Sequence, residues 1–144
     1  MSSVVGGIQV AVVFVWLGMV LGISFLETPL KFRAPGMTVP LGVAIGRLVF
    51  RALNAIECVF AVALIVCAAL GAVADTALTV WVLVTLCVIL FAGAFVLRPL
   101  MDRRVRTGAA SDGLPRNRLH VWYVLLEALK VAGLIVLGVV YLRA

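Results

Sequence analysis

Four long runs of apolar residues, separated by short polar stretches, dominate the hydrophobic pattern of this chain. They cover about residues 4–26, 41–69, 76–97 and 119–142. A bilayer has a hydrocarbon core about 30 Å thick, and a helix needs roughly 20 apolar residues to cross it. Each run meets that length. The pattern therefore predicts an all-α fold, a bundle of four transmembrane helices that forms one membrane domain over residues 1–144.

The composition excludes a soluble globular domain. Hydrophobic residues make up 65% of the 144 residues, charged residues make up 12%, and the mean hydropathy is +1.27. Soluble domains carry about 25% charged residues. The first run lacks the basic start and the small-residue cleavage site of a signal peptide. We therefore expect it to be retained as a helix of the bundle.

The net charge of +6 reflects membrane topology and does not indicate nucleic-acid binding. Ten of the twelve lysines and arginines lie at or near the first and third connections, namely Lys31, Arg33, Arg47, Arg51, Arg98, Arg103, Arg104, Arg106, Arg116 and Arg118. Cytoplasmic loops carry such an excess. This predicts a multi-pass protein of the inner (plasma) membrane with both termini outside. Membrane lipids are the expected partners, because basic segments attract anionic headgroups.

Polar and charged side chains fall on one face of three of the predicted helices. The second helix carries a stripe about 120° wide, formed by Arg47, Arg51, Asn54 and Glu57. The last and first helices contribute His120, Tyr123, Glu127, Lys130 and Glu27. Charged residues within a span normally face the bundle interior or an aqueous cavity. We therefore predict a polar cleft, open to the cytoplasm, that binds a small lipophilic or ionic ligand or a proton in transport or resistance.

The same residues leave two other interpretations open. In the first, Glu57 pairs with Lys130 and Glu127 with Arg51, and these pairs only hold helices in register in an accessory subunit. In the second, the protein is a membrane enzyme for a lipophilic substrate, with Glu57 or His120 as general base.

The sequence predicts no metal site and no cofactor. Cys58, Cys67 and Cys87 lie within apolar runs without a CxxC spacing, so we expect them to be small packing residues. His120 and Glu127 are seven residues apart, which is about 10 Å along a helix and too far to ligate one ion.

Two glycine pairs, Gly18/Gly22 and Gly42/Gly46, have the small-xxx-small spacing that lets helices approach closely in lipid. They predict close packing and leave open whether the protein is a homo-oligomer. The sequence shows no evident internal repeat.

Several short motifs resemble a bacterial four-span domain of unknown function. They are "WLGMVLGISFLETPLKF", "GRLVFRAL", "LRPLMDRRV" and "RNRLHVWYVLLEALK". That group is similar to the human transmembrane-protein drug-resistance family and, distantly, to copper-resistance D and HemJ-like proteins. The resemblance implies a four-helix membrane domain without a settled activity. Glu127 stands near where that family tends to carry an asparagine.

Asn54 and Glu57 also resemble part of the Arg…Asn-x-x-Glu motif of the membrane-associated glutathione and eicosanoid enzymes. That resemblance implies the enzyme interpretation. Phe50 occupies the position of the arginine expected in that motif, and the Arg-x-Tyr signal of the third helix is missing.

Overall fold

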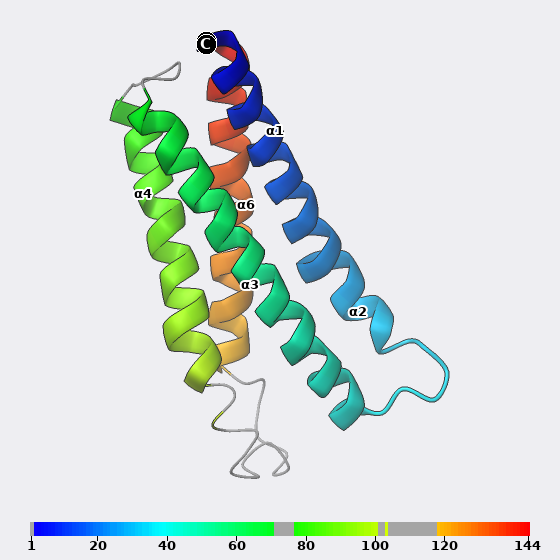
Figure 1. The fold of residues 1–144 in the computed structure, drawn as a ribbon. Coiled ribbons are helices and arrows are strands. Elements are labelled where there is room, and N and C mark those ends of the chain that lie inside the picture. The colour runs from blue at the N-terminus through cyan, green and yellow to red at the C-terminus, as the bar shows by residue number, and fades with distance from the viewer. Residues whose placement is uncertain (1, 71–76, 101–102, 104–117) are drawn as a thin grey trace.

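The computed structural model describes residues 2–70, 77–100, 103 and 118–144, and within them every regular element is a helix. The first helix is continuous and comprises α1 (Ser2–Val20), η1 (Leu21–Glu27) and α2 (Thr28–Lys31). It is followed by α3 (Val39–Ala69), by α4 (Ala77–Phe91) with η2 (Ala92–Leu97), and by α6 (Arg118–Arg143) (Figure 1). The predicted all-α four-helix bundle is confirmed.

Four helices are long and apolar enough to cross a membrane: Val4–Lys31, Val39–Ala69, Ala77–Leu100 and Val121–Arg143. By length and composition the chain is therefore a multi-pass membrane protein. Helix α1 packs against α3 and α6, and α4 packs against the same two helices. The observed helices contain most of the four predicted runs, and the first and third extend further toward the basic end of the bundle.

The largest difference from the predicted bounds lies around the first connection. Pro29 does not end the first helix, which continues to Lys31. Helix α3 begins at Val39, two residues before the predicted start, because Thr38 caps it by accepting a hydrogen bond from the Leu41 N–H at 3.4 Å. Pro40 fits the first turn, where its missing N–H leaves no partner unsatisfied.

A π-helical segment precedes a proline in two of the helices. In η1 the N–H of Thr28 donates to the carbonyl of Ile23, five residues earlier, and Pro29 follows. In η2 the N–H of Arg98 donates to the carbonyl of Gly93, also five residues earlier, and Pro99 follows. Single-turn π segments are rare and frequently mark functional sites.

The bundle consists of two helical hairpins that bury corresponding positions. Buried residues of α1 and α4 match when 70 is added to the residue number of α1, a relation that we call an offset of 70. The matching residues are Gln9, Val13, Trp16 and Val20 in α1, and Thr79, Leu83, Leu86 and Leu90 in α4. An offset of 73 relates α3 to α6, where they are Asn54, Glu57, Ala61 and Leu64 in α3, and Glu127, Lys130, Leu134 and Leu137 in α6. The two hairpins run in the same direction (Figure 1).

Two of the corresponding residue pairs contact each other. The rings of Phe50 and Tyr123 meet edge to face at 5.6 Å, and Glu57 pairs with Lys130 at 2.8 Å. Residues that contact their own counterparts lie close to a pseudo-twofold axis, so the hairpins are related like the parallel repeats of some transporters. The correspondence lies in the positions that are buried and hardly in the residue types, which agrees with the absence of an evident repeat in the sequence.

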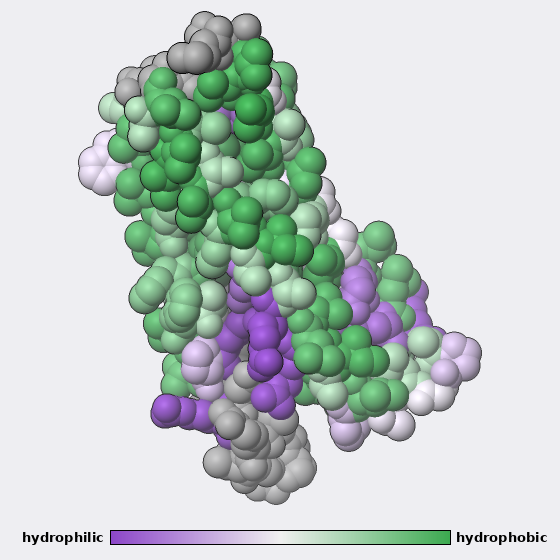
Figure 2. All heavy atoms as spheres, viewed as in Figure 1, coloured by the Kyte–Doolittle hydropathy of each residue, from purple (hydrophilic) through white to green (hydrophobic). Residues whose placement is uncertain are grey.

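The apolar core extends from the end of the bundle that carries Arg143 to about the middle of the helices. Val13, Trp16, Leu64, Leu134 and Leu137 are all fully buried there. Hydrophilic side chains gather toward the opposite end, where the surface between the helices is hollowed (Figure 2). Most of the charged side chains among the described residues thus lie in the half of the bundle that carries the first connection.

Candidate functional site

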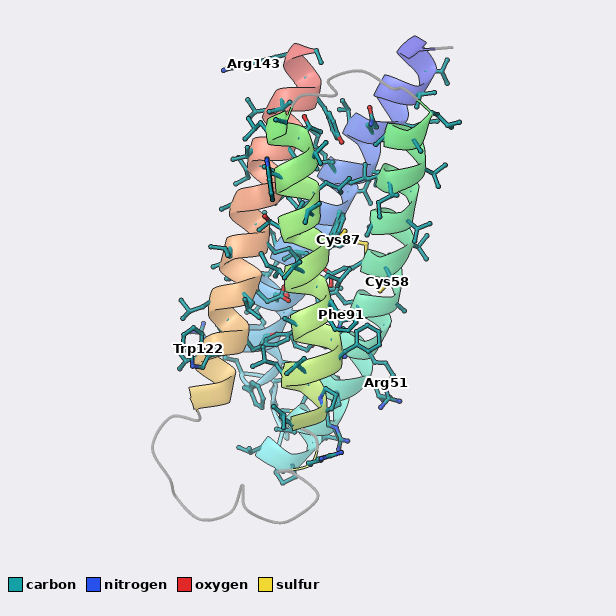
Figure 3. The ribbon with its side chains drawn as sticks, turned by 90° about the vertical axis from the view of Figure 1, so that its left-hand side faces the viewer. Arg51, Cys58, Cys87, Phe91, Trp122 and Arg143 are labelled. Atoms are coloured by element: carbon teal, nitrogen blue, oxygen red, sulfur yellow. The ribbon has the colours of Figure 1, made fainter. Side chains whose placement is uncertain are left out.

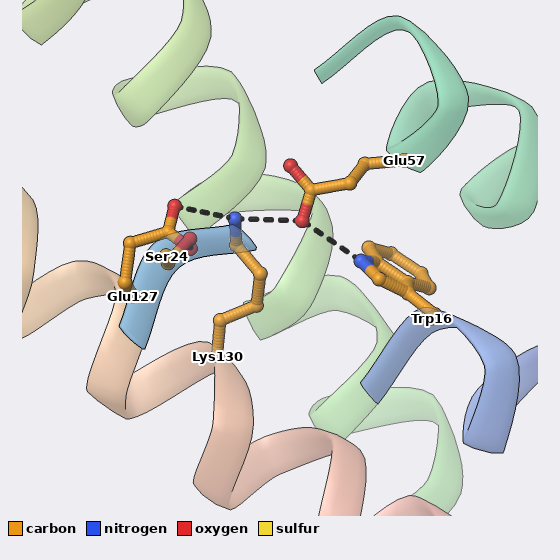
Figure 4. Close-up of polar contacts among 5 residues, drawn as sticks. All are labelled: Trp16, Ser24, Glu57, Glu127 and Lys130. Carbon is orange, nitrogen blue, oxygen red and sulfur yellow. Dashed lines mark hydrogen bonds and ion pairs between the residues drawn. The ribbon is translucent and has the colours of Figure 1, made fainter. Parts of the chain in front are cut away.

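Three charged side chains form a buried network at the centre of the bundle. The Nζ atom of Lys130 on α6 lies 2.8 Å from Oε1 of Glu57 on α3 and 2.8 Å from Oε1 of Glu127, one turn away on α6 (Figure 4). The exposed fractions of the three residues are 2%, 0% and 4% in that order. Lys130 therefore joins two helices that face each other diagonally across the bundle.

Two neutral donors on the first helix complete this network. The indole N–H of Trp16 donates to Oε1 of Glu57 at 2.8 Å (Figure 4). The hydroxyl of Ser24 donates to Oε2 of Glu127 at 3.0 Å. Ser24 belongs to the π-helical segment η1, whereas Trp16 lies on α1. We call these five residues the charge network.

The charge network lies within the apolar span. Lys130 is eight residues from Trp122 and thirteen from Arg143 along α6, or about 12 Å and about 20 Å. The hydrocarbon core is about 30 Å thick, so the network lies in the half of the span nearer Trp122. Buried charges at such depth cost several kcal/mol each unless they are paired and hydrogen-bonded. The network meets that requirement for Lys130.

The charges in the network do not balance. Two carboxylates face one ammonium group, which leaves an excess negative charge unless one carboxyl group carries a proton. The second oxygen of Glu57, Oε2, is buried and has no hydrogen-bond partner among the described residues. The arrangement can therefore hold an additional proton without a change of shape.

A cavity of about 230 Å³ adjoins the network at Glu127. Its charged lining residues are Lys31, Arg47, Arg98 and Glu127, and its aromatic lining residues are Phe25, Phe32, Phe50 and Tyr123. We call it the Glu127 cavity. It lies between the end of the first helix, the start of α3 and the start of α6, so it combines three cations, one buried acid and an aromatic wall.

The Gly42/Gly46 pair shapes this cavity. A Cβ atom on Gly46 would lie 2.9 Å from Nζ of Lys31, and a Cβ atom on Gly42 would overlap the ring of Phe32. These glycines thus give room to side chains from the end of the first helix. Gly18 and Gly22 make no such close contact within the described chain, since an added Cβ atom would meet nothing within 4 Å there.

A second cavity, of about 260 Å³, lies between α3 and η2. Its lining residues are Arg51, Asn54, Ala55, Cys58, Ala94, Phe95, Arg98 and Pro99. We call it the Arg51 cavity. Several of these residues correspond to lining residues of the Glu127 cavity under the two offsets: Ala94 to Ser24, Phe95 to Phe25, and Asn54 to Glu127. The two cavities are therefore pseudo-symmetric counterparts with different chemistry.

The structure divides the nine predicted site residues among several places. Glu57, Glu127 and Lys130 form the network, and Arg47, Tyr123 and Glu127 line the Glu127 cavity. Arg51 and Asn54 line the Arg51 cavity. The prediction of a single cleft was therefore wrong in extent, because the stripe on α3 turns around the helix and reaches two different interfaces.

Two of the nine lie outside this arrangement. Glu27 pairs with Lys31 at 3.3 Å, at the edge of the Glu127 cavity. The side chain of His120 lies outside the described residues. Of the two predicted ion pairs, Glu57 with Lys130 is present, whereas the described partner of Glu127 is Lys130 and Arg51 is exposed.

Sequence reasoning missed several residues of the site. Trp16, Ser24, Lys31, Phe50 and Arg98 are not among the nine predicted site residues, although all five belong to the network or line a cavity. The position of Trp16 in line with Gln9 and Glu27 on the first helix was the available signal for it. Among the described residues, no group of three or more histidine, cysteine or acidic side chains could hold a metal ion.

Comparisons of the chain with protein-family models, curated proteins and solved structures find no match. The resemblances to the four-span bacterial domain and to the glutathione and eicosanoid enzymes therefore stay predictions. Any assignment of function rests on the site itself.

Proposed function

We propose that this protein binds a small ligand in the Glu127 cavity and couples its binding to the protonation of the buried charge network, in transport or resistance. One observation carries the proposal. Glu127 lines the cavity, and its Oε1 atom also pairs with Nζ of the buried Lys130 at 2.8 Å. A ligand in the cavity is therefore one side chain away from the charges at the centre of the bundle.

The lining supports a ligand that is both charged and apolar. Lys31, Arg47 and Arg98 supply three cations at the cavity, and Phe25 and Phe50 supply apolar surface. A pocket with an apolar wall and a few convergent polar groups is the usual form of a small-molecule site. An acidic group on the ligand would lie near the cations, and a group that exchanges protons would lie near Glu127.

The excess negative charge of the network supports the coupling. A ligand that gives a proton to Glu127, or takes one from it, changes the net charge of a group buried in the span. Such a change alters the relative free energies of different arrangements of the surrounding helices, because an unpaired charge at this depth is costly. Intramembrane acids with this property serve as proton relays in transporters.

The orientation and location of the protein also belong to this proposal. Lys31, Arg33, Arg47, Arg51 and Arg98 belong to the segments around the first and third connections, at one end of the described bundle. Figure 3 shows Arg143 at the opposite end from Arg51. The positive-inside rule then places the Glu127 cavity at the cytoplasmic side of an inner (plasma) membrane, with both termini outside.

The test compares Glu127→Gln with Glu27→Gln, which removes the same charge outside the network. Both variants and the wild type would be purified in a mild detergent, then compared by thermal unfolding and by native mass spectrometry of co-purifying small molecules. We expect a bound molecule in the wild type and in Glu27→Gln. In Glu127→Gln it should be lost, with the melting temperature largely kept, because the amide retains the shape of the side chain.

A molecule retained equally by Glu127→Gln and the wild type would contradict the proposal. Where nothing co-purifies, a thermal-shift screen of amphipathic anions and cations takes its place. The expected result is then a compound that stabilises the wild type and Glu27→Gln but not Glu127→Gln. Absence of such a compound from a broad screen would contradict the proposal as well.

A further inference from the structure

The pseudo-twofold relation breaks down at one pair of helix contacts. Helix α1 packs tightly on α6, where a Cβ atom on Gly138 would lie 3.0 Å from Phe14 and 3.4 Å from Val13. Under the two offsets, Gly138 corresponds to Ile65, Phe14 to Val84 and Val13 to Leu83. These three line an open groove between α3 and α4, with a cavity volume of about 580 Å³.

This α3–α4 groove is apolar along its length. Its remaining lining residues are Ala68, Val80, Cys87, Val88 and Phe91. Its lower end leads toward the Arg51 cavity, because the ring of Phe91 stacks at 4.9 Å on that of Phe95, which lines that cavity. Figure 3 shows Cys87, Cys58 and Phe91 one below another along this face, with Arg51 beneath them.

The Arg51 cavity differs from the groove in charge. Arg51 and Arg98 bring two guanidinium groups to it, and Asn54, which is 8% exposed, adds an amide. None of its lining residues is acidic. Guanidinium groups match phosphate oxygens in geometry and bind them through paired hydrogen bonds.

The depth of these arginines matches that of lipid headgroups. Arg51 lies eighteen residues before Ala69, the last residue of α3, which is about 27 Å along the helix and close to the thickness of the hydrocarbon core. Arg98 lies two residues before Leu100, near the same end of the helix Ala77–Leu100. Ten residues from Arg98 toward the centre reach Val88 at the lower end of the groove, about 15 Å away, or half of the hydrocarbon core.

We infer that the Arg51 cavity and the lower end of the α3–α4 groove together bind one anionic phospholipid. Its phosphate lies between Arg51 and Arg98 and accepts hydrogen bonds from them and from the Asn54 amide. One acyl chain runs past Phe95 and Phe91 to Val88, where α3 and α4 leave room for it. The site is separate from the ligand site proposed above, apart from Arg98, which lines both cavities.

The experiment uses Arg51→Gln, because Arg51 lines the Arg51 cavity and not the Glu127 cavity. The matched control is Arg33→Gln. Arg33 is an exposed arginine at the same end of the bundle, and it lines neither cavity. Each protein would be incubated in detergent with phosphatidylglycerol or phosphatidylcholine and examined by native mass spectrometry. Inorganic phosphate is added as a competitor that has the charge of the headgroup but no acyl chain.

We expect the wild type and Arg33→Gln to retain one phosphatidylglycerol in preference to phosphatidylcholine. Arg51→Gln should retain about tenfold less of it, since a charge-assisted hydrogen bond contributes about 1.5 kcal/mol or more. Arg51→Lys should retain an intermediate amount, which tests the site in a variant that keeps the charge. Millimolar phosphate should not displace the lipid, because it lacks the chain.

Four results would overturn the inference. Equal retention of the two lipids would remove the role of the anionic headgroup. An equal loss in Arg51→Gln and Arg33→Gln would mean that surface charge alone attracts the lipid. Displacement by phosphate would point to a site for free anions. A dimer without bound lipid would place a second copy of the chain in the groove.

Discussion

The most informative perturbation removes the charges of the network one at a time. Lys130→Met takes away the ammonium group that lies 2.8 Å from both Glu57 and Glu127 and leaves these two buried carboxylates without it. Glu57→Gln leaves Lys130 paired with Glu127, so the remaining buried charges balance. The two variants should therefore differ in stability, although each removes one member of the same ion pair.

The expected magnitudes follow from burial. Removing one partner of a buried ion pair costs about 3–5 kcal/mol, because the other partner is left uncompensated. We expect Lys130→Met to fall in that range. Glu57→Gln weakens hydrogen bonds to a charged group and should cost about 1.5–3 kcal/mol. Glu27→Gln is the control: its carboxylate pairs with Lys31 at 3.3 Å but is 32% exposed, so it should cost no more than about 1 kcal/mol.

The assay is a double-mutant cycle on the free energy of unfolding, measured by titration with a denaturing detergent and by thermal unfolding. The double variant Glu57→Gln/Lys130→Met retains one buried carboxylate and should be more stable than the sum of the single losses predicts. Coupling energies between contacting residues are about 0.5–3 kcal/mol. Additive losses, or a Glu57→Gln variant less stable than Lys130→Met, would refute the reasoning about uncompensated charge.

Two further predictions test the topology and the packing. With the native cysteines removed, Ser111→Cys in the third connection should react in intact cells only with a membrane-permeant thiol reagent; labelling by an impermeant reagent would reverse the proposed orientation. Gly138→Val should destabilise the bundle by about 1–3 kcal/mol through overpacking, because a Cβ atom there already lies 3.0 Å from Phe14, whereas Gly18→Val, with nothing within 4 Å, should have little effect in the same unfolding assay.

The number and approximate bounds of the helices could be predicted from the sequence, because a membrane span imposes a minimum length of apolar residues. The pair of Glu57 and Lys130 could be anticipated for a related reason. A charge deep in a span needs a partner, and few candidates exist in this chain. Both inferences follow from the high cost of polar groups in hydrocarbon and do not depend on details of packing.

The two cavities could not be predicted in the same way. Helical periodicity places Arg47, Arg51 and Asn54 on one broad face, but it does not say which neighbouring helix each side chain meets. Asn54 lies toward η2, and Arg47 lies toward the first helix and α6. That division depends on how the helices are arranged around α3, which the sequence pattern leaves open.

The π-helical segments and Trp16 were missed for a different reason. Pro29 is normally read as the end of a helix, and only the arrangement of hydrogen bonds shows that η1 carries the chain through it. Trp16 lies within an apolar run, so the hydrophobic pattern does not distinguish it from a tryptophan at the membrane interface. Its role as a donor to Glu57 becomes visible only when the two helices are placed side by side.

The pseudo-twofold relation offers a physical reason why the central charges differ between the hairpins. Residues close to such an axis contact their own counterparts, so identical charges at positions 57 and 130 would repel each other at a point where both side chains are almost fully buried. A glutamate in one hairpin and a lysine in the other turn that repulsion into an ion pair at 2.8 Å. The neighbouring positions then also diverge: Glu127 adds a second acid beside one cavity, and its counterpart Asn54 keeps the other cavity free of acidic side chains. One shared framework thereby supports a cavity that combines cations with a buried acid on one side of the bundle, and on the other side a cavity whose charged lining residues are both arginines.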